Sequence, residues 1–144
     1  MYNPNFRMKE KQLIIKSKIL ANKFIIADGH IDLPHRLKKA GYLNKDDVLD
    51  ITKNTDGDFD YKKSKKGGLD APFMSIYIPA EFQESSKEKK LADSLIDMVI
   101  KITESFPDKF ALANNPSEIK HNFSKGLISL PMGIENGAAI EKKL

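Results

Sequence analysis

A histidine and an aspartate two residues apart, His30 and Asp32, are the side chains around which this sequence is organised. They follow the apolar run 24–27, which is typical of a short strand buried on both faces of a parallel sheet. Asp28 and Gly29 indicate that the chain then leaves regular structure. If extended geometry continues, His30 and Asp32 point the same way and offer half of a divalent metal site. Taken alone, the pattern is more often an Asp-Gly turn with a solvated His and Asp.

Three stretches together resemble one family. Residues 28–34 (DGHIDLP) resemble the opening metal-binding motif of the membrane (renal-type) dipeptidases, metallopeptidases built on a TIM-like barrel. Residues 66–79 resemble the second barrel strand of that family. Residues 133–137 (GIENG) resemble the end of its third strand, where a Glu bridges two metal ions. The stretches occur in the family's order and with similar spacing, and they span nearly the whole chain.

The resemblance implies hydrolysis of a dipeptide's peptide bond by a water molecule that two zinc ions activate. His30 and Asp32 would hold the first ion, and Glu135 would bridge both. The second ion needs two further histidines, which the family supplies from later strands. His35 and Tyr77 are candidates for the substrate side of the site, with ordinary packing as the alternative for both. Asp60 lies where the family often has a supporting Asp.

The length of the chain limits this interpretation. An eight-stranded barrel needs about 250 residues, whereas this sequence has 144. We therefore expect a single, incomplete dipeptidase barrel domain over residues 1–144, the amino-terminal portion of a TIM-like (β/α)8 barrel. As partners we expect a dipeptide substrate and either further copies of the chain or the missing carboxyl-terminal segment. The alternative is a non-catalytic remnant or interaction module that retains the fold signature.

The remaining pattern independently favours an α/β fold with parallel strands, because strands and helices alternate along the chain. The segment 44–66 is polar and predicts a long loop with a short helical piece near 46–52. The predicted helices are 8–21, 35–40, 85–106 and one between Asn115 and Gly126, and the further predicted strands are 67–79, 110–113 and 127–132.

Composition excludes several other functions. There is no cysteine, so neither disulfides nor thiolate metal sites are available. The net charge of +4 comes mainly from scattered lysines and argues against nucleic-acid binding. No apolar run approaches the roughly 20 residues of a membrane-spanning helix. The first residues do not form a signal peptide, which predicts a cytoplasmic protein unless a signal was removed. The loop 56–60 (DGDFD) lacks the ligand spacing of an EF-hand, so calcium is not expected there.

Overall fold

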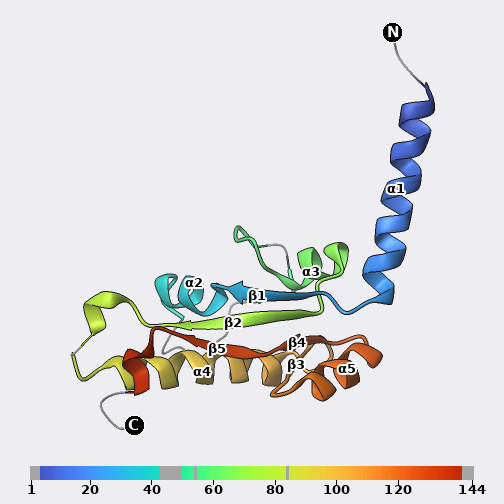
Figure 1. Ribbon diagram of the computed structural model, residues 1–144. Coiled ribbons are helices and arrows are strands. Elements are labelled where there is room, and N and C mark those ends of the chain that lie inside the picture. Colours follow the sequence, from blue (N-terminus) through green and yellow to red (C-terminus); the bar gives the residue numbers. More distant parts are fainter. Residues whose placement is uncertain (1–3, 43–49, 54, 84, 141–144) are drawn as a thin grey trace.

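A computed structural model describes residues 4–42, 50–53, 55–83 and 85–140 (Figure 1). Helices and strands alternate along most of the chain, as the sequence predicts. The helices are α1 (Pro4–Lys23), α2 (Leu33–Lys39), α3 (Tyr61–Gly67), α4 (Glu88–Ser105) and α5 (Pro116–Ser124), with short 3-10 turns at Ala80–Phe82 and Gly137–Ile140. The strands are β1 (Ala27–Ile31), β2 (Ala71–Tyr77), β3 (Phe110–Leu112), β4 (Ile128–Leu130) and β5 (Met132–Glu135).

All strand pairs are parallel, which confirms the predicted α/β class. One sheet has the order β1-β2-β5, and β3 pairs with β4 in a second. The predicted strand 127–132 is in fact broken at Pro131, whose nitrogen cannot donate to a ladder. The predicted strand contains β4, which pairs with β3, whereas β5 starts at its last residue, Met132, continues beyond it and pairs with β2. β4 and β5 together connect both sheets, and Glu135 is the last residue of β5.

The core lies between the sheet and the helices that cover its outer face. Met74 and Ile76 of β2 are fully buried, as is Ile78 just beyond it. They join the apolar face of α4 in one cluster, which lies within the helix predicted over 85–106 and consists of Leu91, Leu95, Met98, Val99 and Ile102. The predicted ends of α5 are also correct: the Asn115 side chain accepts a hydrogen bond from the Glu118 amide, and Gly126 has a positive φ.

The prediction of a buried strand over 24–27 was wrong. β1 begins at Ala27 and runs through Asp28 and Gly29, and its residues are exposed or half-buried. Phe24 is 56% exposed. The side chains of a strand project to the two faces of the sheet, so their burial depends on elements packed over those faces, and in the described structure β1 has extensive contacts only with its sheet neighbour β2. Apolar side chains make burial of a strand favourable, but they are buried only where another element packs over them.

Helix α1 also differs from its prediction. It starts before the predicted range 8–21 and extends beyond it through Asn22 and Lys23, and it projects away from the sheet (Figure 1). Its apolar side chains, among them Leu13 and Ile15, are largely exposed. No helix within the described ranges is long and apolar enough to cross a membrane.

The polar segment before β2 contains a helix that the sequence pattern did not predict. Tyr61–Gly67 forms α3, which has no apolar periodicity and is started by the Asp60 side chain accepting from the Lys63 amide. Gly67 and Gly68 end this helix and do not open the strand; Gly68 has a φ of 79°. The helical piece predicted at 46–52 falls mostly outside the described residues. Helix α2 matches its prediction closely, although it starts at Leu33.

Candidate metal centre

The structure brings together the three side chains that the sequence singled out as metal ligands. His30 lies in β1, Asp32 directly follows that strand, and Glu135 ends β5. The His30 Nε2 atom is 3.3 Å from Asp32 Oδ1 and 3.6 Å from Glu135 Oε2. One ligand atom from each residue lies within 4.8 Å of the other two. The predicted convergence at one end of a parallel sheet is therefore confirmed.

Strand topology explains why residues a hundred positions apart meet. β1 and β5 lie on either side of β2 and run parallel to it, so the carboxyl ends of all three strands lie at the same end of the sheet. The β1 register is irregular between Asp28 and Ile31, where the Asp28 carboxylate accepts a hydrogen bond from the His30 amide at 2.9 Å. Such irregularities re-aim side chains at the end of a strand. This one lies where His30 must turn toward Asp32 and Glu135.

Asp32 is placed by the start of α2. It occupies the N-cap position of that helix, where an aspartate usually caps a backbone amide. Its side chain makes no such hydrogen bond here. The carboxylate instead faces His30, and its Oδ1 atom lies 3.3 Å from His30 Nε2.

Glu135 is held by a residue that the sequence analysis missed. The buried Ser75 hydroxyl donates to Glu135 Oε2 at 2.8 Å. Asn136, in a left-handed backbone conformation, donates from Nδ2 to the Ile78 carbonyl oxygen and ties the end of β5 to the end of β2. The available signal for Ser75 was a hydroxyl in an otherwise apolar strand, in line with Phe73 and Tyr77 on one face. Only the strand register shows that it meets Glu135.

The geometry fits a zinc ion. Two ligands bound tetrahedrally to one zinc at about 2.0–2.2 Å lie about 3.3–3.6 Å apart. The two measured separations from His30, 3.3 and 3.6 Å, match this range. One imidazole nitrogen and two carboxylate oxygens are also a donor set that zinc accepts. The side chains are 52% (His30), 62% (Asp32) and 47% (Glu135) exposed, and His30 and Glu135 line a shallow pocket with Phe73 and Ser75.

The other two histidines do not join this group. His35 lies in α2, and its ring meets the Tyr77 ring edge-on with centroids 5.2 Å apart. Its Nδ1 atom is buried and has no hydrogen-bond partner among the described residues. His121 is an exposed residue of α5. Over the parts of the chain that the structure describes, His30, Asp32 and Glu135 are the one such cluster found.

Known proteins are similar to this chain in sequence and in fold. An uncharacterised dipeptidase of Schizosaccharomyces pombe is 26% identical over 132 residues, which cover 83% of this chain and 32% of the relative. The dipeptidase aclJ of Aspergillus oryzae is 27% identical over 125 residues, covering 76% of this chain and 28% of aclJ. The chain thus spans about a third of the length of the curated relatives it matches.

Solved structures agree in fold. The probable dipeptidase PvdM from Pseudomonas aeruginosa superposes with a TM-score of 0.74 at 15% identity, covering 92% of this chain and 33% of PvdM. A metallopeptidase from Rhodobacter sphaeroides, liganded with a phosphinate mimic of the dipeptide L-Ala-D-Ala, gives 0.64 at 19% identity, covering 81% and 39%. The chain therefore has the fold of a portion of the TIM-like dipeptidase barrel. Residues 15–144 match the family profile of the membrane dipeptidases, and the chain belongs to that family, peptidase family M19.

Proposed function

We propose that this chain supplies the first-metal ligands and the bridging carboxylate of a zinc dipeptidase. The observation that carries the proposal is the convergence of His30, Asp32 and Glu135 at the carboxyl ends of the strands. The distances from His30 Nε2 to one oxygen each of Asp32 and Glu135 suit two ligands of one zinc ion. His30 and Asp32 hold the first ion. Glu135 bridges to a second, because a carboxylate has two oxygens and can accept from Ser75 while still facing two cations.

Two bound zinc ions would supply Lewis acidity that lowers the pKa of a water molecule and polarises a peptide carbonyl. The chain's own residues hold the ligands in place and shape the substrate side. We assign His35 and Tyr77 to that side, because they lie at the same edge of the sheet and the buried Nδ1 atom of His35 has no partner among the described residues. The substrate class is a dipeptide, by analogy with the relatives and with the phosphinate-bound neighbour.

The second ion needs ligands beyond this group. His35 packs against Tyr77, and His121 is exposed on α5, so neither completes a second site in the described structure. We propose that those ligands come from a further part of the barrel. The competing function, a non-catalytic interaction module, keeps the fold but binds no metal at these three residues.

A turnover assay separates these possibilities. We expect the purified 144-residue chain to bind zinc but to hydrolyse dipeptides no faster than buffer, because half of a two-metal ligand set is lacking. The assay follows amine release with and without added zinc. Zinc-dependent hydrolysis that Asp32→Ala abolishes would contradict the proposed incompleteness. Failure to bind zinc at all would favour the non-catalytic module.

Two open strand edges suggest how the chain associates. β1 and β5 each pair with β2 alone within the sheet, which leaves unpaired backbone groups on their outer sides in the described structure. Exposed apolar side chains flank both edges, including Phe24 and Ile26 before β1 and Ile134 within β5. We propose that further strands of a barrel cover these edges, either from a carboxyl-terminal segment or from another copy of the chain.

Sedimentation velocity tests this association. The chain alone is expected to self-associate at tens of micromolar, because pairing the edges buries both apolar surface and orphan amides. Charged substitutions on the two edge strands, Ala27→Lys in β1 and Ile134→Lys in β5, are expected to reduce the association. A monodisperse monomer at high concentration would contradict the proposal.

A further inference from the structure

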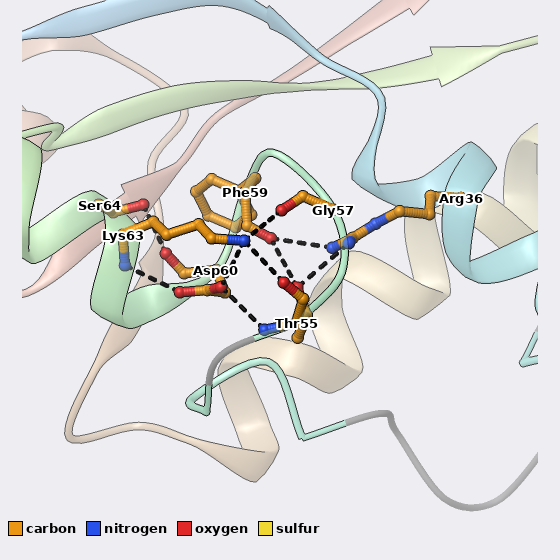
Figure 2. Close-up of polar contacts among 7 residues, drawn as sticks. All are labelled: Arg36, Thr55, Gly57, Phe59, Asp60, Lys63 and Ser64. Atoms are coloured by element: carbon orange, nitrogen blue, oxygen red, sulfur yellow. Dashed lines mark hydrogen bonds and ion pairs between the residues drawn. The ribbon is translucent and has the colours of Figure 1, made fainter.

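A lysine ammonium group occupies the centre of the acidic loop 55–60. Lys63 Nζ donates to the Thr55 carbonyl oxygen at 2.6 Å and to that of Gly57, and it lies 3.3 Å from Asp60 Oδ2 (Figure 2). Two carbonyl oxygens and a carboxylate oxygen are ligands typical of a bound cation. The loop therefore has the form of a cation site in which the chain supplies its own cation.

Asp60 fixes this arrangement from inside. Its side chain has no solvent exposure, and its two oxygens accept from the Lys63 amide at 2.8 Å and the Thr55 amide at 3.0 Å. Burial raises the pKa of Asp60, but the two backbone hydrogen bonds and the Lys63 ammonium outweigh burial, so its pKa lies below its ordinary value. Asp60 is therefore an ionised carboxylate that holds both the start of α3 and the loop.

A second cation reaches the same loop from α2. The Arg36 guanidinium donates to the Phe59 carbonyl oxygen at 2.8 Å and to Thr55 Oγ1 at 3.1 Å (Figure 2). Gly57 permits this approach: a Cβ atom added there would lie 1.5 Å from Arg36 Nη1 and 2.1 Å from Cζ. Any other residue at position 57 forces the guanidinium out of its place.

Arg36 connects the loop to the metal centre through one helical turn. Its backbone amide donates to the Asp32 carbonyl oxygen at 3.0 Å, and α2 starts directly after Asp32. Asp32 is thus the N-cap residue of this seven-residue helix, and Arg36 lies one turn further along it. Leu33 and Leu37 fix one face of this helix in the core. The Arg36 guanidinium adds two hydrogen bonds from this helix to the loop 55–60.

We propose that Arg36, Gly57 and Lys63 form a clamp that positions Asp32 for metal binding. The inference rests on the proposed metal centre. Arg36 is a positioning residue, since it acts through the start of α2 and not by contact with a ligand. Because the residues that orient metal ligands typically change affinity by about 10–100-fold when mutated, loss of a more distant clamp is expected to cost about 3–10-fold.

The sharpest test displaces the guanidinium without removing a polar group. Gly57→Ala is expected to weaken zinc binding by the full chain about 3–10-fold, measured by competition with a chromophoric chelator. Gly67→Ala is the matched control, because a Cβ there meets nothing within 4 Å. It should leave zinc affinity unchanged, and both substitutions affect the entropy of the unfolded chain alike. Amide hydrogen exchange should accelerate within α2 in Gly57→Ala alone.

A double-mutant cycle separates positioning from general damage. Arg36→Met keeps the apolar stem and removes the guanidinium, so its loss of zinc affinity should equal that of Gly57→Ala, and the double variant should lose no more than either. Additive losses, or unchanged zinc affinity in a folded Gly57→Ala protein, would overturn the clamp. If the unsubstituted chain itself binds no zinc, the proposed metal centre fails instead. In that case, amide hydrogen exchange in α2 that is unchanged by Gly57→Ala would overturn the proposed clamp as well.

Discussion

Replacing Asp32 with alanine is expected to lower the zinc affinity of the chain by about 100-fold or more, because it removes one of three ligands. The Asp32 carboxylate lies 3.3 Å from His30 Nε2 and makes no helix-capping hydrogen bond, so its loss removes a ligand at little cost to α2.

Ser75→Ala leaves all three ligands in place and frees Glu135 to rotate. Its expected loss is about tenfold. Chelator competition at constant pH measures both.

The control for this series is Asp93→Ala, which removes a carboxylate from the exposed face of α4 together with its ion pair to Lys89. It should leave zinc affinity unchanged. Equal affinities of the Asp32→Ala variant and the unsubstituted chain would mean that zinc binds elsewhere. A loss with Asp93→Ala of similar size would mean that zinc binds diffusely to surface carboxylates.

Asp60→Asn is expected to destabilise the chain by about 3 kcal/mol near neutral pH. Both Asp60 oxygens accept from backbone amides, whereas an asparagine side chain has one oxygen and must turn an NH2 group toward one of those donors. The substitution also leaves the Lys63 ammonium without its carboxylate. Urea unfolding followed by circular dichroism measures the change in the free energy of unfolding.

The pH dependence of this loss follows from the pKa of Asp60. Its pKa in the folded chain lies below its ordinary value of 3.8, so the stability it contributes is fully present above pH 3.8 and is lost as pH falls through the folded pKa. The difference between the Asp60→Asn variant and the unsubstituted chain should therefore shrink below about pH 4. Asp58→Asn, an exposed position in the same loop, should change stability by less than about 0.5 kcal/mol. Equal effects at both positions would contradict the role of Asp60.

The sequence was sufficient to predict that His30, Asp32 and Glu135 meet. Parallel strands carry their carboxyl ends to one edge, so residues that follow such strands converge wherever the strands lie in one sheet. The amphipathic stripe of α4 and the caps of α5 were also predictable, because both depend on neighbours within a few residues. Local chemistry determines the features of α4 and α5, whereas the meeting of the three side chains follows from the order of the parallel strands.

Features that depend on distant partners were not predictable in this way. Ser75 contacts Glu135 only through the register of β2 against β5. Helix α3 was missed for a different reason: it has no apolar periodicity, and only the local cap of Asp60 on the Lys63 amide marks its start. The exposure of β1 could not be read from its apolar flank, since burial of its side chains requires elements packed over the faces of the sheet.

Anomalous diffraction at the zinc edge from zinc-soaked crystals of the chain tests whether His30, Asp32 and Glu135 bind zinc. We expect a peak bonded to His30 Nε2 and to one oxygen each of Asp32 and Glu135, at about 2.0–2.2 Å. Ser75 should still donate to Glu135 in that structure. A peak elsewhere, for example at His121 on α5, with none among these three residues, would contradict the account.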